Sequence, residues 1–285
     1  MEAEFLAPET VEEALEALRG DGALALGGGT QVGILIRHGL LAAERLVWLG
    51  RVEGLRGIAS LDDGLEIGAG VTLAEIADSA LVRDRHPMLA AAAARVGNPR
   101  VRAVATLGGH LAHADPRQDL PPVLLALDAV ATARGPRGER QIPLTDLFLG
   151  PFDTCLAEGE LLTRVRIPVA PPGRRSRYTR FTPGSEADYP TVGVAARLEL
   201  EDGAVRRLVL GLGGVAGQPL RLEPSELVGQ PSGPELFDAA AEAAVRASDP
   251  TSDQRGSAGY KRAMVRLWAR RTLAALAAAD GADRG

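Results

Sequence analysis

The first forty residues alternate short apolar stretches with polar turns. Residues 8–19 carry apolar side chains at helical spacing, behind Thr10 and, three residues further on, Glu13. This order is typical of an amphipathic helix that begins with a capping box. Residues 23–40 then run from an apolar stretch through three successive glycines into a second helical pattern. That pattern predicts a strand, a tight turn and a helix.

Strands and helices also mix in the next part of the chain. The patterns of residues 44–52 and 55–72 predict short strands, and the second segment forms a hairpin that turns at residues 62–64. Thr72 begins another helix, and residues 87–96 form an apolar helix that stops at a glycine, an asparagine and a proline. We find no internal repeat.

Prolines and arginines interrupt a strand-like pattern at residues 168–175, where we expect a domain boundary. Beyond it, residues 191–215 predict two or three alternating strands with a turn at Asp202 and Gly203, and residues 236–279 are helical. The C-terminal part is therefore predicted to be a small antiparallel sheet covered by helices. The chain as a whole is expected to have an α+β fold.

Composition and charge are those of an ordinary globular protein. The 285 residues are 46% hydrophobic and 24% charged, enough to bury a substantial core. A net charge of −5 gives no field that would recruit nucleic acid. No run of eighteen apolar residues occurs, and the N-terminus is acidic without an apolar segment. We therefore expect a cytoplasmic protein that does not insert into a membrane.

Cysteine and histidine usage limits the redox and metal chemistry of the chain. Cys155 is the single cysteine, which excludes an intramolecular disulfide and any iron–sulfur or zinc site built from several thiolates of this chain. The four histidines are too scattered to predict a metal site, although His110 and His113 are three residues apart. A redox centre would have to be an organic cofactor or belong to a partner, and we predict no metal ligands and no catalytic residue in this chain.

The first candidate binding motif is the turn Gly27-Gly28-Gly29-Thr30-Gln31. Three glycines allow positive φ and close approach of the backbone, and the amides of the following helix start favour an anion such as a pyrophosphate. An isolated turn of this kind is as often required for backbone reasons alone. It matches neither the G-x-G-x-x-G dinucleotide fingerprint nor a Walker A loop.

A second glycine-rich motif follows at residues 105–120. Here we expect Gly108 and Gly109 to present backbone amides, Thr106 to supply a hydroxyl, and Asp119 to accept a hydrogen bond from a ribose or ribitol hydroxyl. Two separated glycine turns suit a long ligand whose pyrophosphate lies between them.

These two motifs, GGGTQ and ATLGGHLAHADPRQD, resemble the FAD-binding loops of the flavoprotein subunit of molybdenum hydroxylases, the medium-subunit family of xanthine dehydrogenase and carbon monoxide dehydrogenase. Four further segments resemble that family in the same order: residues 147–168, 180–196, 210–221 and 257–273. The resemblance covers nearly the whole chain. It implies a two-part FAD-binding domain of the PCMH type at residues 1–170, with subdomains meeting near residue 55, and a C-terminal domain of the carbon monoxide dehydrogenase flavoprotein type at residues 175–285.

The resemblance also implies a set of cofactor contacts. One side of the FAD pyrophosphate would be wrapped by the first turn, the other by Gly97 and the second turn, and Asp119 would hold a sugar hydroxyl. Leu162 and Arg180 match positions near the flavin ring, and Tyr189 falls where some relatives place an aromatic ring. The complete set is Gly27, Gly28, Gly29, Thr30, Gln31, Gly97, Thr106, Leu107, Gly108, Gly109, His110, Asp119, Leu162, Arg180 and Tyr189.

Three positions depart from the family pattern. Gln31 stands where Asp or Ser is usual, His110 where Asn or Asp is frequent, and Gly184 replaces a frequent arginine. The first two lie in loops that act mainly through backbone amides, so FAD binding should survive, whereas Gly184 bears on the ring environment or on subunit docking. Two of these residues also have a purely structural interpretation: Asp119 could cap the turn before Pro121, and Tyr189 could be an ordinary core residue.

The resemblance implies a FAD-binding electron-transfer subunit of a molybdenum hydroxylase. Its partners would be a molybdenum-cofactor-binding large subunit, which oxidises the substrate, and a [2Fe–2S] small subunit, which passes electrons to the FAD. Two alternatives stay open: a stand-alone FAD-dependent oxidoreductase that acts directly on a small molecule, and a non-catalytic assembly module that has lost FAD.

Overall fold

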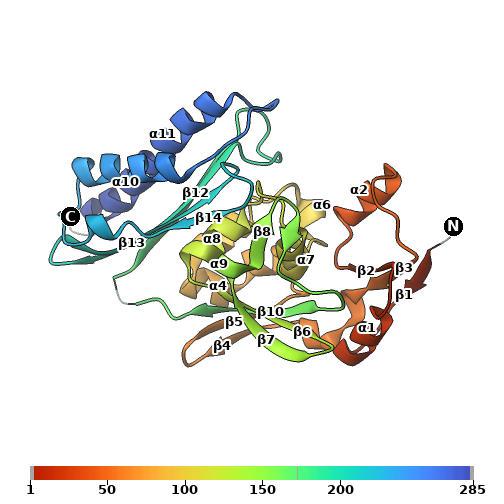
Figure 1. Cartoon of the computed structure of the whole chain (residues 1–285). Coiled ribbons are helices and arrows are strands. Elements are labelled where there is room, and N and C mark those ends of the chain that lie inside the picture. Colours follow the sequence, from red (N-terminus) through yellow and green to blue (C-terminus); the bar gives the residue numbers. More distant parts are fainter. Residues whose placement is uncertain (1–2, 172, 283–285) are drawn as a thin grey trace.

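A small parallel sheet forms the N-terminal end of the computed structural model, which describes residues 3–171 and 173–282 (Figure 1). Its strands lie in the order β1-β3-β2, and α1 and two short 3-10 helices accompany them. The elements are β1 (Glu4–Leu6), α1 (Val11–Ala17), β2 (Ala23–Leu26), α2 (Val32–Arg37), β3 (Arg45–Trp48), η1 (Leu49–Arg51) and η2 (Glu53–Leu55). The predicted strand, turn and helix around the three glycines are confirmed as β2 and α2.

Helix α1 begins as its sequence predicts. The Thr10 side chain accepts a hydrogen bond from the Glu13 amide at 3.1 Å, and the Glu13 carboxylate accepts from the Thr10 amide, so the capping box is confirmed. Val11 and Ala14 are buried and pack in one cluster with Val47 of β3. The helix therefore covers one face of the parallel sheet.

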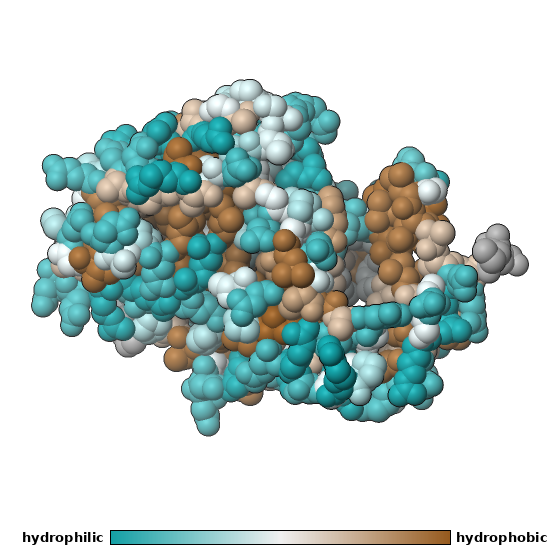
Figure 2. Space-filling model, viewed as in Figure 1, coloured by the Kyte–Doolittle hydropathy of each residue, from teal (hydrophilic) through white to brown (hydrophobic). Residues whose placement is uncertain are grey.

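Helix α2 differs from α1 because none of its residues is buried. Ile34, Ile36 and the following Leu40 are exposed, and Figure 2 shows apolar side chains gathered over this helix, which stands apart from the rest of the surface. The chain leaves the glycine turn, forms this short arm and returns to β3.

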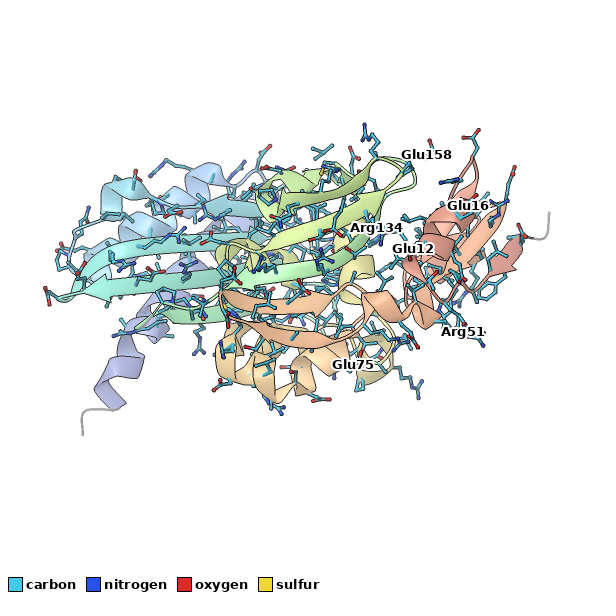
Figure 3. The ribbon with its side chains drawn as sticks, turned by 90° about the horizontal axis from the view of Figure 1, so that it is seen from below. Glu12, Glu16, Arg51, Glu75, Arg134 and Glu158 are labelled. Carbon is cyan, nitrogen blue, oxygen red and sulfur yellow. The ribbon has the colours of Figure 1, made fainter. Side chains whose placement is uncertain are left out.

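The middle of the chain forms a five-stranded antiparallel sheet in the order β4-β5-β10-β6-β7. The predicted hairpin is confirmed, with Asp62 and Asp63 between its two strands. Arg134 of β6 reaches Glu12 of α1 at 2.6 Å and so links this sheet to the N-terminal part (Figure 3). The strands are β4 (Ile58–Leu61), β5 (Gly64–Gly68), β6 (Val130–Gly135), β7 (Gly138–Pro143) and β10 (Leu161–Pro168), with a separate pair β8 (Phe148–Gly150) and β9 (Asp153–Thr154).

Short helices cover one side of the five-stranded sheet and share its largest core. Thr72 begins the first of them, as predicted, and the structure shows a second capping box there. The helix expected at residues 87–96 is confirmed as α5. The helices are α3 (Leu73–Asp78), α4 (Ala80–Arg85), α5 (Pro87–Ala93), α6 (Pro99–Arg102), α7 (Leu107–His113), α8 (Leu120–Ala126) and α9 (Leu144–Leu147).

The C-terminal part is a four-stranded antiparallel sheet whose outer face carries two helices (Figure 1). Helix α8 packs against its inner face, so these helices lie between the two large sheets. The helical tail expected at residues 236–279 is two helices, because residues 248–257 form turns held by Asp253 and Ser252. The elements are β11 (Arg175–Phe181), β12 (Val192–Glu201), β13 (Ala204–Gly213), β14 (Leu220–Leu222), η3 (Ser225–Leu227), α10 (Pro234–Ala247) and α11 (Ala258–Ala282).

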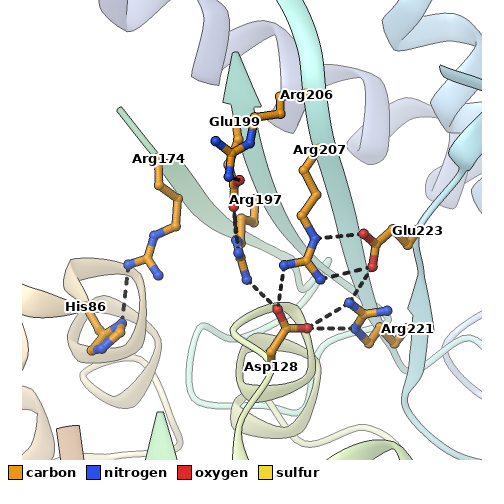
Figure 4. A network of polar contacts seen from close by, with 9 residues as sticks. All are labelled: His86, Asp128, Arg174, Arg197, Glu199, Arg206, Arg207, Arg221 and Glu223. Carbon is orange, nitrogen blue, oxygen red and sulfur yellow. Dashed lines mark hydrogen bonds and ion pairs between the residues drawn. The ribbon is translucent and has the colours of Figure 1, made fainter. Parts of the chain in front are cut away.

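One aspartate ties the central helices to the C-terminal sheet. Asp128 follows α8 in the left-handed conformation, with φ of 56°, and its carboxylate faces three arginines of the sheet (Figure 4). Arg197 and Arg221 lie 2.7 Å from it and Arg207 lies 3.0 Å from it. The arrangement fixes the junction at the end of α8, and the predicted α+β class is confirmed.

Candidate functional site

A cavity of about 370 Å³ lies between the N-terminal parallel sheet and the segment that carries α7 and β10. Residues of both glycine-rich turns line it: Gly27 and Gly28 from the first, and Thr106, Gly108 and Gly109 from the second. The rest of its wall is mostly apolar and comes largely from the end of β3 and the segment after it, from the loop after β5 and from β10. A volume of this size, with a few polar groups in an apolar wall, is typical of a small-molecule site.

The first glycine turn offers a row of free backbone donors. The amides of residues 28–32 donate to no other atom in the described part of the chain, and the first turn-closing bond runs from the Gly33 amide to the Gly29 carbonyl at 2.9 Å. Gly29 has φ of 68°, which favours glycine. Successive unpaired N–H groups at such a turn attract an anion.

The two glycine turns contact each other so closely that side chains would not fit. A Cβ on Gly28 would lie 1.8 Å from the Val104 carbonyl oxygen, and a Cβ on Gly27 would lie 2.6 Å from Thr106 Oγ1. The contact explains the need for glycine at both positions and brings the predicted motifs to one cavity.

The second turn does not offer the amides that its sequence led us to expect. The Gly108 amide donates to the Ala69 carbonyl at 2.7 Å, the Gly109 amide to Thr106 Oγ1 at 3.2 Å, and the His110 amide to the Thr106 carbonyl at 2.9 Å. The Leu107 amide is also used, by the Val71 carbonyl. The expectation of free amides at Gly108 and Gly109 is therefore wrong, because this segment is the capped first turn of α7, bonded to the loop after β5.

The wall of the cavity also contains residues that the sequence did not single out. Trp48, Arg56, Glu160 and Leu161 line it together with Leu162, which the resemblance had indicated. Leu162 is buried on β10. Among the other lining residues, Trp48 alone had a sequence signal. It is an aromatic residue at the end of a strand, and Gly50 follows two residues later.

Gln31 and Tyr189 meet across the chain although they are 158 residues apart. The Gln31 side-chain amide donates to the Tyr189 hydroxyl. The Arg117 guanidinium lies 5.2 Å from the centre of the Tyr189 ring and is held by the buried Asp115, at 2.9 Å between Nη2 and Oδ2. Burial raises the pKa of Tyr189 to about 12, so its hydroxyl is neutral and accepts this bond at physiological pH.

Asp119 and Arg180 are brought together, but neither lines the cavity. Both are buried, and Arg180 Nε lies 3.3 Å from Asp119 Oδ1, which also accepts a hydrogen bond from the Tyr178 hydroxyl at 2.8 Å. The Arg180 guanidinium also donates to the carbonyls of Arg95 and Asp188. Burial raises the pKa of the Asp119 carboxyl to about 6, and the Arg180 charge opposes that rise. The predicted roles of both residues toward the cofactor stay predictions.

Gly97, Thr30 and His110 complete the predicted set. Gly97 has φ of 50°, and its carbonyl accepts from Arg102. His110 Nε2 is buried with no hydrogen-bond partner in the described residues, and burial lowers the pKa of this imidazole to about 3. His110 is therefore neutral. Gly97, Thr30 and His110 do not line the cavity, so their contacts stay predictions too.

The residues present fit the cofactor that the resemblance implies. FAD needs a site for its pyrophosphate, and the unpaired amides after Gly27 offer one. The backbone must also approach the pyrophosphate closely, and glycine allows this because it has no side chain. Within residues 3–171 and 173–282, no group of three or more His, Cys, Asp or Glu side chains is arranged to hold a metal ion. The helices of this part of the chain are each too short or too polar to cross a membrane.

Two domain families match the chain in succession. Residues 1–170 match the FAD binding domain in molybdopterin dehydrogenase, and residues 177–276 match the CO dehydrogenase flavoprotein C-terminal domain. Together they cover almost all of the chain.

Individual proteins are similar over nearly their whole length. The 6-hydroxypseudooxynicotine dehydrogenase complex subunit alpha of Paenarthrobacter nicotinovorans is 35% identical over 95% of this chain and 93% of its own. The carbon monoxide dehydrogenase medium chain of Hydrogenophaga pseudoflava is 33% identical over 95% of each. A solved structure of carbon monoxide dehydrogenase from Hydrogenophaga pseudoflava that lacks the Mo-pyranopterin moiety of its molybdenum cofactor has a chain with a TM-score of 0.94 at 33% identity, covering 98% of each chain.

Proposed function

Because the chain belongs to the family of FAD-binding medium subunits of the molybdopterin dehydrogenases, we propose that it receives electrons from a [2Fe–2S] partner subunit and passes them to an external acceptor. The chain is a flavoprotein subunit of an oxidoreductase complex, and its cofactor is FAD. The family also accounts for the two-part PCMH-type fold and the C-terminal sheet with its helices. We place the boundary between the two domains at residues 170–175, which the two matched ranges support.

The row of free amides at residues 28–32 is the observation that carries the assignment of the cofactor site. We propose that these amides and Gly27 hold the pyrophosphate from one side. Thr106 faces them from the other side with its hydroxyl, whose proton is free to be donated while its oxygen caps α7. Leu107, Gly108, Gly109 and His110 then act by shaping the wall, because their amides are already bonded.

FAD supplies, when bound, the reversible uptake and release of electrons. The protein must hold it, orient it and leave its reactive ring accessible. We propose that the ring lies on the side of the Gln31–Tyr189 contact, where Arg117 is a fixed cation beside the Tyr189 ring. Asp119 and Arg180 act there as positioning residues, because their buried ion pair fixes the Asp188 carbonyl next to Tyr189.

The partners follow from the family and from the single cysteine. A cluster held by several thiolates must come from another chain, and the relatives are subunits of dehydrogenase complexes. We propose a molybdenum-cofactor-binding large subunit, where the substrate is oxidised, and a [2Fe–2S] small subunit. The cytoplasmic location expected from the sequence stays a prediction.

The first test is the visible absorption spectrum of the full chain purified alone. Flavin bands are expected, together with a chromophore that heat releases and that co-elutes with FAD. A colourless protein that also fails to bind added FAD would contradict the cofactor site and favour the assembly module.

The second test concerns electron flow and uses the co-purified complex. Bleaching of the flavin bands by the substrate of the large subunit, only when the small subunit is present, is expected. Turnover of a small molecule by this chain without partners would favour the stand-alone oxidoreductase instead.

A further inference from the structure

A cluster of charged side chains at the end of α8 contains more arginines than carboxylates (Figure 4). The carboxylates of Asp128, Glu199 and Glu223 each pair with at least two arginines of the C-terminal sheet. Five arginines face these three carboxylates, so two positive charges are left over, although the whole chain has a net charge of −5. The members of this arginine cluster are Arg174, Arg197, Arg206, Arg207, Arg221, Asp128, Glu199, Glu223 and His86.

Arg174 is the arginine of this cluster without an acidic partner. Its Nη2 donates to the Arg85 carbonyl and lies against His86 Nδ1, each at 3.3 Å. Burial lowers the pKa of His86 to about 4, so its imidazole is neutral at physiological pH. No carboxylate within residues 3–171 and 173–282 forms an ion pair with Arg174, and its Nε and Nη1 donors have no acceptor there. Two uncharged groups therefore hold this guanidinium in place.

A second guanidinium acts on Arg174 with the same sign of charge. The Arg197 side chain is 7% exposed, and Asp128 and Glu199 hold it with hydrogen bonds of 2.5 to 2.9 Å. Burial and the charge of Arg197 lower the pKa of Arg174 to about 10, and the more distant Glu199 and Asp128 oppose this shift without cancelling it. The Arg174 charge is thus destabilised where it is held, and an anion beside it would remove that cost.

The arginine cluster can be reached from solvent and is separate from the cofactor cavity. Arg174 is half-buried, and the Arg206 side chain is 60% exposed. None of the nine residues of the cluster lines the cavity between the N-terminal sheet and β10. A ligand bound here would therefore not compete with the cofactor.

We propose that the arginine cluster binds a phosphate group against Arg174 and Arg197, beside the exposed Arg206. At pH 7 a phosphate group on an ester carries about 1.5 to 2 negative charges, which matches the two uncompensated arginines, whereas a carboxylate carries a single charge. Guanidinium groups bind phosphate oxygens through their fork of N–H donors, and Arg174 has such donors free. The phosphate group is that of the free ion or of a phosphate ester.

The test measures binding of inorganic phosphate to the full chain saturated with FAD, by isothermal titration calorimetry at an ionic strength kept constant with chloride. One bound phosphate per chain is expected. Arg174→Gln should weaken binding at least about tenfold, because charge-assisted hydrogen bonds are lost. Arg206→Gln should weaken it in the same direction and leave the fold intact, since this side chain is exposed. Absence of binding to the wild type, or unchanged binding to Arg174→Gln, would overturn the proposal.

Arg177→Gln is the matched control for the loss of a positive charge. Arg177 is exposed on β11, three residues from Arg174. Its replacement should leave phosphate binding within about twofold, because salt screens an exposed charge at a distance. Equal losses in Arg177→Gln and Arg174→Gln would mean that net charge alone attracts phosphate, and the site would be wrong.

Two further comparisons identify the occupant. AMP that binds more tightly than phosphate would assign the site to a phosphate ester, and AMP that binds equally or more weakly would assign it to the free ion; in both cases Arg174→Gln must weaken both ligands. Phosphate at the glycine turns would instead be lost in Gly28→Ala and kept in Arg174→Gln, so the result does not depend on the assignment of the cofactor. If Arg174→Gln weakens only co-purification with partner subunits, a partner's carboxylate occupies the cluster and the proposal fails.

Discussion

The hydroxyl of Thr106 lies where a side chain on Gly27 would have to go, because a Cβ on Gly27 would be 2.6 Å from Thr106 Oγ1. The same oxygen accepts the Gly109 amide at 3.2 Å and so caps α7. One hydroxyl thus sets the distance between the two glycine turns and begins the helix behind the second. The order of these motifs along the chain gives no hint of this coupling.

Removal of the hydroxyl should partly relieve the effect of a side chain at residue 27. We expect Gly27→Ala to cost about 1–3 kcal/mol of unfolding free energy, as overpacking does, and Thr106→Ala about 1 kcal/mol through the lost cap. The double variant should be more stable than the sum of the two losses predicts, by about 1 kcal/mol. Urea unfolding of the four proteins measures this difference, and strict additivity would show that the turns do not press on each other.

At Gly28, no side-chain substitution elsewhere can make room for a Cβ. Its Cβ would meet the Val104 carbonyl, which belongs to the backbone, at 1.8 Å, so the turn that carries the free amides must move. We expect Gly28→Ala to weaken FAD binding at least tenfold, as measured by titration of the stripped protein. Gly33→Ala is the matched control, because a Cβ there meets nothing within 4 Å and alanine suits α2. Equal affinities of the two variants would contradict the placement of the pyrophosphate.

Local signals predicted much of the fold. The capping box at Thr10, the helix start at Thr72 and the hairpin before Gly64 were predicted because each depends on residues close in sequence. The break in the C-terminal tail was missed, although residues 248–257 between the two helices contain no alanine and include Pro250 and Gly256, which interrupt a helix. Helix α10 therefore ends where polar residues and a proline follow it, and not where its apolar spacing changes.

The site was less readable than the fold. Both glycine turns could be recognised in the sequence. The hydrogen bond from the Gly108 amide to the Ala69 carbonyl could not, because it depends on where β5 ends in space, and the sequence pattern does not give that position. Trp48 and Glu160 are 112 residues apart and meet only through the cavity. Contacts of this kind follow from the packing of sheets and are visible only in three dimensions.

The junction at Asp128 should be a main source of stability. Its carboxylate contacts all three of Arg197, Arg207 and Arg221 (Figure 4). Glu199 pairs with the first of these arginines and Glu223 with the other two, so Asp128 is the one carboxylate of this network that joins all three. Asp128→Asn keeps the left-handed backbone that asparagine tolerates but removes the charge, and we expect a loss of about 2 kcal/mol in urea unfolding. Added salt should reduce that loss, because it screens the arginines.

Asp238→Asn is the control for Asp128. Asp238 pairs with Arg270 at 2.6 Å, but both side chains are more than half exposed. Such a pair is worth less than about 1 kcal/mol. Equal losses in the two variants would mean that the three-arginine junction contributes no more than a surface pair.

The buried Asp119 should make stability depend on pH in a direction opposite to that of most carboxylates. Burial raises its pKa from 3.8 to about 6 in the folded protein. Between these values the folded state keeps a proton that the unfolded state has released, so the free energy of unfolding falls as pH rises. The stabilising contribution is complete below about pH 4 and is lost as pH rises through about 6.

Asp119→Asn removes this titration and keeps the shape of the side chain. The difference in unfolding free energy between wild type and variant should therefore decrease by about 2–3 kcal/mol from pH 4 to pH 7, measured by urea unfolding at each pH. Asp238→Asn, which removes an exposed carboxylate, should show no such trend. A difference that stays constant with pH would mean that the charge of Arg180, 3.3 Å from the carboxylate, fully offsets the cost of burying it.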